Sequence, residues 1–365
     1  MKPRLIDIAR LAGVSKATAS RALADSPLVN EETKRRVNKI AKELLYQPNA
    51  LAQAVATKRS GILGFCMYRR QMPYFGHTFF GPLLDGAIQE AKLHNYHIVV
   101  ATTEVENDTF DEHFIQDSID GAILISFKPR DAMLEFRRRN IPLVFVNDAI
   151  PSPNNAFIVD ENYNGARSLM EHLISERGHK KIAFISDRLS HPSYYLRYLA
   201  YLDVHREHGI PVYANDAIRS RNLWGVYSPP DEEKLSMYGL QRQPVVGTPF
   251  ITEGTGSMSA YRLVGRMLET GNLPTAIFAA TDSIAMGAIK AILDAGLKIP
   301  QDIAVAGYDD IEAAEICHPS LTTVRVNRNE MGRLAVQELL AQIVDPGLKS
   351  RMLFVQNELI VRQST

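Results

Sequence analysis

Residues 15–21 bring together side chains that suit nucleic acid binding: short hydroxyls and two cations within seven positions. Serine and threonine hydroxyls reach phosphate, arginine reaches guanine or phosphate, and the methyl group of an alanine can touch a thymine methyl. On one face near the N-terminus of a helix, such residues fit the major groove of DNA. The candidate DNA-binding residues here are Ser15, Lys16, Ala17, Thr18, Ser20 and Arg21. The competing interpretation is a small helical bundle whose basic residues are merely solvated.

A helix-turn-helix pattern would position these side chains. Apolar residues before Gly13 repeat at helical spacing, and Gly13 tolerates the left-handed backbone that ends a helix. Ser15 is a plausible N-cap for a second helix that runs to residue 23, with Ala19 and Ala22 facing inward. A connection of three or four residues with a glycine sets two helices at a steep angle. The predicted inner face of the first helix is Leu5, Ile8, Ala9 and Ala12, and Leu11 can close it.

A third helix is predicted to begin after Asn30, whose side chain can cap it. Its predicted buried stripe is Val37, Ile40, Ala41, Leu44 and Leu45.

Charge separates this head from the rest of the chain. The chain is neutral, with 41 Lys and Arg against 41 Asp and Glu among 365 residues. Residues 1–60 hold twelve of the bases and five of the acids, a net +7, so the remainder carries −7. A basic head on an acidic body is expected when one domain meets phosphate and the other does not.

After Gly61 the pattern predicts a different fold class. Short apolar runs such as "ILGFCMY", "GAILISF", "PLVFVND", "KIAFISD" and "AIFAATD" alternate with amphipathic helices near 81–94, 162–178 and 283–296. Continuous runs of this kind indicate parallel strands covered on both faces. Their number favours two doubly wound α/β lobes with a cleft between them. Ligands in such sheets lie beyond the carboxyl ends of the strands, so residues that close each strand are candidates.

Several classes of protein are disfavoured. The two cysteines, Cys66 and Cys317, lie far apart and show no metal-binding spacing, which favours a reducing compartment over a disulfide scaffold. The polar N-terminus and the absence of a long apolar run predict neither a secretory signal nor a membrane span. No P-loop, GxSxG, HExxH or C-x-x-C motif is present. We therefore expect a cytoplasmic protein that is not an enzyme and needs no metal or cofactor.

The ordered sequence resembles a known family. "IDIARLAGVSKATASRAL…VNEETKRRVNKIAKELLYQPNALAQAV" resembles the DNA-binding head of the lactose/galactose repressor (LacI/GalR) family. "FFGPLLDGAIQEA", "ERGHKKIAFIS", "ATDSIAMGAI" and "IPQDIAVAGYDD" resemble, in order, landmarks of its body, which is similar to periplasmic sugar-binding proteins. The resemblance implies a helix-turn-helix domain at 1–47, a hinge helix at 48–60 and an effector-binding and dimerisation domain at 61–365. We expect one lobe at about 61–160 and 321–344, and the other at about 161–320 and 345–365.

The resemblance also assigns roles in DNA binding. Lys16 and Ala17 fall on the positions that choose bases in the family, and the other residues of the 15–21 set fall on contacting positions. Asn30 joins the candidate DNA-binding residues.

The stretch "YQPNALAQAVATKRSG" is too short to form a stable helix alone in water, so we expect it to become helical when two copies pack on DNA. In the family a leucine of this hinge inserts into the minor groove, and an arginine precedes it in the sequence. Here Val55 stands at the position of that leucine and Gln53 at the position of that arginine. The shorter wedge predicts a smaller kink.

Effector contacts are implied at several strand ends and helix starts. Asp282 coincides with a ligand-binding aspartate of the family, although it can equally be a helix N-cap. Arg197 falls on an effector-contacting arginine, with an exposed, acid-paired arginine as the alternative. Phe79 and Phe80 lie where the family has cleft aromatics, or in the core. Asn147 and Asp160 lie where the chain meets the cleft, and can also be hinge or capping groups.

One stretch departs from the family. Residues 210–249 are about 20 positions longer than is usual, and they contain Trp224, the only tryptophan. Trp224 either is partly buried in a solvent-facing loop or stacks on a sugar from a flap.

These observations predict a homodimeric transcriptional repressor of carbohydrate-use genes that binds operator DNA and a sugar between its lobes. The alternatives are the same architecture sensing a nucleoside or phosphorylated metabolite, and a transport-type sugar-binding protein.

Overall fold

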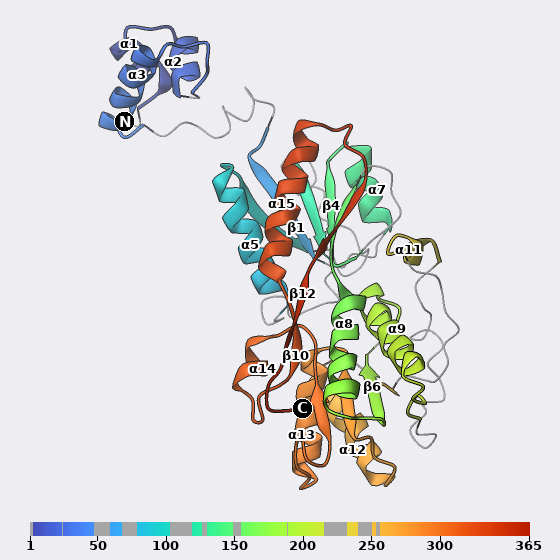
Figure 1. The fold of residues 1–365 in the computed structure, drawn as a ribbon. Helices are drawn as coiled ribbons and strands as arrows, with labels where there is room; N and C mark the ends of the chain where they lie inside the picture. Colours follow the sequence, from blue (N-terminus) through green and yellow to red (C-terminus); the bar gives the residue numbers. More distant parts are fainter. Residues whose placement is uncertain are drawn as a thin grey trace. The chain divides into compact units, whose positions relative to one another are not determined.

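The computed structural model describes residues 3–23, 25–46, 59–67, 79–102, 119–125, 130–148, 155–187, 189–214, 232–239, 250–252 and 256–365. The chain divides into two compact units, Met1–Gly61 and Ile62–Thr365 (Figure 1). Among the described residues, no helix is both long and apolar enough to cross a membrane.

The first unit is a three-helix domain made of α1 (Leu5–Leu11), α2 (Lys16–Leu23) and α3 (Glu31–Glu43). Both predicted caps are present: Ser15 Oγ accepts a hydrogen bond from the Thr18 N–H at 3.0 Å, and Asn30 Oδ1 accepts one from the Thr33 N–H at 2.8 Å. Gly13 has a φ of +65°, as expected for the residue that ends α1. The small core consists of Ile8, Ala9, Ala12, Ala19, Ala22, Val29, Val37 and Ala41.

Two predicted core residues of this domain are exposed. Leu11 is 57% exposed because successive helical residues turn by 100°, which carries it away from Ala9. Leu45 is 85% exposed because it follows the C-cap of α3 with a left-handed φ of +50°, which turns its side chain from the core.

The second unit begins with a six-stranded parallel sheet in the order β11-β5-β4-β3-β1-β2. Alternate residues of β3 face different cores: Ile123 and Ile125 pack in one, Ala122 and Leu124 in the other. Both faces are therefore covered, as the continuous apolar runs predict. With its helices this sheet is called the first lobe. It contains β1 (Ile62–Met67), α5 (Phe80–Leu93), β2 (His97–Thr102), β3 (Gly121–Ile125), α7 (Arg130–Arg138), β4 (Leu143–Val146), β5 (Ala156–Asp160), α15 (Arg328–Val344) and β11 (Arg351–Val355).

Two glycines let α5 and α15 approach closely. A methyl group at Gly86 would lie 2.0 Å from the carbonyl oxygen of Asn329, and one at Gly332 would lie 2.0 Å from that of Leu83. Only glycine allows this contact between backbones.

A four-stranded parallel sheet in the order β7-β6-β8-β9 builds the second lobe. It contains α8 (Asn162–Glu171), the π-helical turn η2 (His172–Glu176), β6 (Ile182–Ser186), α9 (Pro192–Glu207), β7 (Phe250–Ile251), α12 (Ser257–Glu269), β8 (Ala276–Ala279), α13 (Asp282–Asp294), β9 (Ala304–Ala306) and α14 (Glu312–Ile316). The short helix α11 (Glu232–Ser236) precedes β7 in the chain. The predicted fold class, a helical head followed by two doubly wound parallel-sheet lobes, is confirmed.

The chain crosses between the lobes at β5–α8, β10–α15 and β11–β12, where β10 (Thr323–Val326) pairs antiparallel with β12 (Asn357–Ile360). The predicted assignment of 345–365 to the second lobe is wrong for β11. This strand extends the first sheet by pairing in parallel with β5, from Arg351 opposite Ala156 to Val355 opposite Asp160. β11 occupies the edge of the first sheet beside β5, and the chain returns to the second lobe only with β12.

Candidate functional sites

The N-terminal half of α2 presents the predicted DNA-binding face. Lys16, Ala17, Ser20 and Arg21 are exposed. Thr18 is half-buried, and its hydroxyl is hydrogen-bonded to that of Ser15 at 2.8 Å. The helix therefore offers two cations, one hydroxyl and one methyl to a groove, while Ser15 and Thr18 organise its first turn.

Lys34 is a cation of this head that serves the fold instead. Its Nζ lies 2.7 Å from Asp25 and 3.0 Å from Glu31, and it is 8% exposed. The hydrogen bond to Asp25, followed by that to Glu31, raises the pKa of Lys34. The predicted contact residues Gln53, Val55 and Trp224 lie outside the described residues.

In the second unit, Arg197 of α9 is the centre of a polar network where the lobes meet. It is 2% exposed, so the exposed arginine considered from the sequence is excluded. Its Nε donates to Asn162 Oδ1 at 2.8 Å and its Nη1 to the Ala280 carbonyl oxygen at 2.6 Å. Its Nη2 lies 3.4 Å from Asp309 Oδ1 and 4.0 Å from Asp160 Oδ2.

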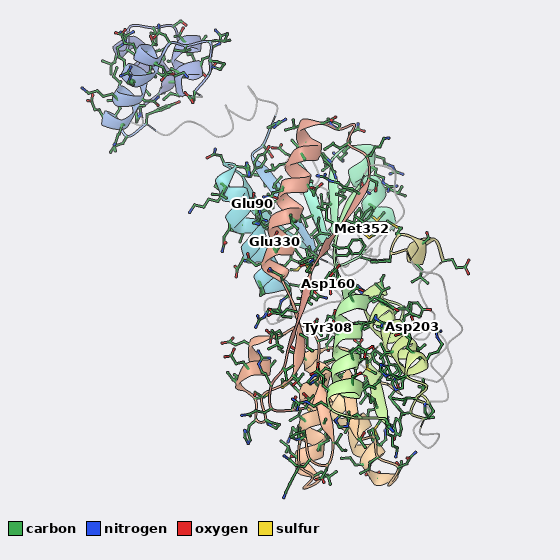
Figure 2. The ribbon with its side chains drawn as sticks, viewed as in Figure 1. Glu90, Asp160, Asp203, Tyr308, Glu330 and Met352 are labelled. Atoms are coloured by element: carbon green, nitrogen blue, oxygen red, sulfur yellow. The ribbon has the colours of Figure 1, made fainter. Side chains whose placement is uncertain are left out.

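Asp160, at the end of β5, connects the same network to Asn357, which lies at the β11–β12 crossover between the lobes. It accepts hydrogen bonds from Asn162 Nδ2 at 2.7 Å and from Asn357 Nδ2 at 3.0 Å. Asn357 also donates to the Tyr308 hydroxyl at 2.6 Å. Figure 2 labels Asp160 and Tyr308 at the junction of the lobes. Asp160 and Arg197, far apart in the sequence, are thus brought together, as a shared site requires.

Asp282 is fully buried in the second lobe, where its side chain is hydrogen-bonded within the protein. Thr281, not Asp282, caps α13, since its hydroxyl accepts the Ile284 N–H at 3.3 Å. The Asp282 carboxylate accepts the Thr323 hydroxyl at 2.6 Å and the Ile311 N–H at 2.9 Å. Burial, reinforced by the nearby Asp309, raises the pKa of Asp282 to about 8. The alternative of a simple N-cap is therefore wrong.

The other candidates have different surroundings. Asn147, which follows β4 with a φ of +60°, accepts a hydrogen bond from the Ser193 hydroxyl of α9 at 3.0 Å and so joins the two lobes. Phe79 and Phe80 are buried in the hydrophobic core with an edge-to-face contact, their ring centroids 5.7 Å apart. In this structure the pair has the core environment considered as the alternative.

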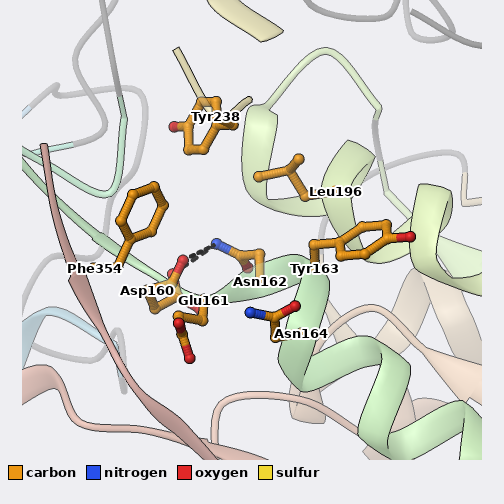
Figure 3. A pocket seen from close by; sticks show the side chains of 8 residues that line it. All are labelled: Asp160, Glu161, Asn162, Tyr163, Asn164, Leu196, Tyr238 and Phe354. Atoms are coloured by element: carbon orange, nitrogen blue, oxygen red, sulfur yellow. Dashed lines mark hydrogen bonds between the residues drawn. The ribbon is translucent and has the colours of Figure 1, made fainter. Parts of the chain in front are cut away.

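A pocket of about 230 Å³ opens beside the network (Figure 3). Apolar side chains and hydrogen-bonding groups both face it, and they come from both lobes and from the segment around α11. The lining residues are Asp160, Glu161, Asn162, Tyr163, Asn164, Leu196, Tyr238 and Phe354. Among them only Asp160 is a candidate predicted from the sequence. Arg197 contacts the pocket residues Asp160 and Asn162 from behind, and Asp282 is not a lining residue.

The residues that sequence reasoning missed had weak signals. Asp309 follows the apolar run "DIAVAGY", so the expectation that ligands lie beyond the carboxyl ends of strands could have identified it. Asn162, Tyr238 and Phe354 carry no comparable pattern. No cluster of three or more metal-ligating side chains occurs in the described part of the chain.

Comparisons with known proteins agree with this architecture. A model of "Bacterial regulatory proteins, lacI family" matches residues 4–49, and one of "Periplasmic binding proteins and sugar binding domain of LacI family" matches 63–222. A "Periplasmic binding protein-like domain" model matches 231–365. The chain belongs to the lacI family of bacterial regulatory proteins. The resemblance stated from the sequence is thereby confirmed.

Relatives named as transcriptional repressors match this lacI-family chain over nearly its whole length. It is 29% identical to the probable HTH-type transcriptional repressor ExuR of Bacillus subtilis, over 98% of this chain and 97% of that protein. It is 28% identical to the ribose operon repressor of Haemophilus influenzae, over 98% and 97%. The chain is accordingly a DNA-binding transcriptional regulator.

Two solved structures share the fold. The Lac repressor dimer bound to operator and the anti-inducer ONPF is 25% identical, with a TM-score of 0.74 and coverage of 100% of this chain and 99% of that one. A complex of the regulator CelR with cellobiose has 23% identity, a TM-score of 0.67 and full coverage of both chains. At that identity the second likeness shows the fold alone.

Proposed function

We propose that this protein is a repressor that binds operator DNA as a homodimer and responds to a neutral, single-ring sugar bound in the pocket beside Asp160 and Asn162. The ribose operon repressor and the operator-bound Lac repressor dimer among its relatives support the DNA partner, the dimer and the carbohydrate link. The DNA-contacting face would be Lys16, Ala17, Ser20 and Arg21 of α2, with Thr18 ordering it. Because operator DNA lies in the cytoplasm, we propose that location too.

The composition of the pocket is the observation that carries the effector assignment. Phe354, Leu196 and Tyr238 supply apolar surface, while Asp160, Asn162 and Asn164 supply hydrogen-bonding groups. Small-molecule sites typically combine a mostly apolar lining with a few placed polar groups. A sugar matches both features, because its hydroxyls donate and accept hydrogen bonds and its ring has faces lined by C–H bonds.

Charge argues against the phosphorylated alternative. The described lining residues include the carboxylates of Asp160 and Glu161 and no lysine, arginine or histidine. Arg197, the nearby cation, is 2% exposed, and its Nε and Nη1 groups donate to Asn162 and Ala280. A phosphate placed here would face two like charges without a cation among the described lining residues to pair with, which costs free energy.

The position of the pocket supplies a route to regulation. Phe354 belongs to the first lobe, while Asn164 on α8 and Leu196 on α9 belong to the second. A ligand that contacts both lobes has a different affinity for each degree of closure, and only that difference can shift the protein between states of high and low operator affinity.

A thermal-shift screen tests this proposal. The panel is D-ribose, D-glucose, D-galactose, glucose 6-phosphate and adenosine, applied to the full-length protein and to Asn164→Ala. Asn164 is exposed and lines the pocket, so its truncation should weaken binding without unfolding the protein. Ser168→Ala, one turn further along α8 at another exposed position, is the matched control.

We expect at least one neutral sugar to raise the melting temperature of the wild type and of Ser168→Ala, and to raise that of Asn164→Ala less. The sugar should be recovered chemically unchanged, because we propose no enzymatic activity. Stabilisation by glucose 6-phosphate or adenosine alone, or an equal shift in all three proteins, would refute the proposed site.

A further inference from the structure

The segment around α11 joins the two lobes. It lies in the chain between α9 and β7, both of which belong to the second lobe. Its side chains pack in two places: Leu235 is fully buried in the large hydrophobic cluster that holds residues of both lobes, while Met237 and Tyr238 contact the first-lobe core cluster that contains Cys66, Phe145 and Phe157. Figure 1 draws α11 at the level of the junction between the lobes. A part of the stretch that departs from the family is therefore anchored beside the pocket.

Tyr238 and Phe354 form aromatic walls of that pocket. Figure 3 shows the two rings on adjacent sides of the space above the hydrogen-bonded pair Asp160 and Asn162, with Leu196 on the side opposite Phe354. The third ring, Tyr163, points its hydroxyl away and donates it to Asp203 Oδ2 at 2.7 Å. Tyr238 therefore adds a second aromatic wall, and a side chain that ends in a hydroxyl, to the described lining of the pocket.

The hydroxyl of Tyr238 stays protonated at neutral pH. Burial raises the pKa of this tyrosine well above its usual value, and the charges of Asp148 and Asp160 raise it further. A protonated phenol can donate one hydrogen bond and accept another, which suits a sugar hydroxyl.

We infer that Tyr238 is a specificity-determining residue of the effector pocket: its ring and that of Phe354 hold the apolar face of one sugar ring, and its hydroxyl distinguishes sugars that differ in one hydroxyl. The inference rests on the proposed function, since it concerns the same pocket. A site built to hydrogen-bond a particular hydroxyl rejects analogues that lack it far more strongly than an apolar wall does.

The size of the pocket limits the ligand. Its volume of about 230 Å³ is below the ~300–1,000 Å³ of typical drug-sized sites. One sugar ring between the two aromatic side chains fits this space.

Calorimetric titration of the full-length protein with D-ribose, D-glucose and D-galactose tests the inference. We expect Tyr238→Ala and Phe354→Ala each to weaken the best-bound sugar by about tenfold, which corresponds to about 1.4 kcal/mol. Tyr238→Phe keeps the ring and its packing; it should bind within about threefold of the wild type but change the ratio of dissociation constants for D-glucose and D-galactose. Tyr261→Ala, which removes a partly buried tyrosine of α12, is the matched control and should alter neither quantity.

The role of Tyr238 would be overturned if Tyr238→Phe and Tyr238→Ala both keep the wild-type sugar affinities and the wild-type ratio of dissociation constants. Weaker sugar binding by Asn164→Ala in the same experiment would leave the proposed function standing. Failure of every sugar to bind the wild type would instead overturn the proposed function and the inference with it. If Tyr238→Ala binds the sugar more weakly but Tyr238→Phe keeps the wild-type ratio of dissociation constants for D-glucose and D-galactose, the role assigned to the hydroxyl would be contradicted.

Discussion

The guanidinium of Arg197 lies over the ring of Tyr308, with Cζ 3.5 Å from the ring centroid. This contact and the hydrogen bonds to Asn162 and Ala280 fix the arginine beneath the pocket. The sequence predicts Arg197 as a ligand-binding residue, whereas in this structure its Nε and Nη1 groups donate to the protein itself. Asn162, which accepts one of these hydrogen bonds, also lines the pocket. Direct contact of Arg197 with an effector stays a prediction.

Arg197→Ala should destabilise the second unit strongly. Removing the cation leaves the buried carboxylates of Asp309 and Asp160 without the charge of Arg197, and breaking a buried ion pair typically costs about 3–5 kcal/mol. Urea unfolding measures the change. Arg167→Ala, which removes a partly exposed arginine paired with Glu207, should lose much less, since solvent screens that pair. Equal losses in the two variants would contradict the structural role of Arg197.

The contribution of Asp282 to stability should fall as the pH rises from about 4 to about 8. The unfolded pKa of an aspartate is about 3.9, whereas burial raises that of Asp282 to about 8 in the folded chain. Within this window the folded chain holds a proton that the unfolded chain releases, so unfolding becomes easier as the pH rises, by at most about 1.4 kcal/mol per pH unit for one group.

Asp282→Asn should flatten this slope, because an amide mimics the protonated acid toward Thr323 and Ile311. A smaller slope should remain between about pH 4 and 6, since burial also raises the pKa of Asp309, to about 6. Denaturation at pH 5, 6.5 and 8 measures both effects, and Asp302→Asn, at an exposed position, serves as the control. A variant as pH-dependent as the wild type would show that Asp282 is ionised when folded.

Gly307→Ala should destabilise the second lobe by about 1–3 kcal/mol. A methyl group there would lie 2.2 Å from Asp282 Oδ1 and 2.8 Å from Leu321 Cδ2, both in packed surroundings. Gly265→Ala on α12 meets nothing within 4 Å and should instead stabilise by about 0.5–1 kcal/mol, because alanine favours a helix. Thermal unfolding of both variants compares the signs; a harmless Gly307→Ala would mean that Asp282 does not lie against this glycine.

Arg21→Ala should weaken operator binding by about tenfold or more and reduce its dependence on salt. The arginine is exposed on the face of α2 proposed to enter the major groove. Fluorescence anisotropy with an operator selected from random duplexes, at several salt concentrations, measures both effects. Lys39→Ala, a 78% exposed cation of α3, should have the smaller effect. The reverse order would assign the DNA-binding face to another helix.

The elements were predictable where the signal is local. Ser15 and Asn30 were recognised as caps because an N-cap bond spans three residues, and the parallel strands were recognised from continuous apolar runs. β11 was assigned to the wrong lobe because its partner, β5, lies nearly 200 residues away and no local pattern records that pairing.

The site was predictable only in part for the same reason. The partners of Arg197 lie 35, 83 and 112 residues away, so the sequence marks the arginine without showing that the protein itself occupies its donors. Tyr238 follows a five-residue helix in a stretch without periodicity, and only tertiary packing brings it to the pocket.

The most direct test of the central claim measures the operator affinity of the full-length protein with and without a saturating concentration of the sugar that stabilises it. Couplings between two sites are typically about 5- to 150-fold. We expect the operator dissociation constant to change by at least about fivefold in the wild type and in Ser168→Ala, and Asn164→Ala to need more sugar for the same change. A sugar shown by calorimetry to bind this pocket, yet leaving operator affinity unchanged, would contradict the proposal that the pocket controls DNA binding.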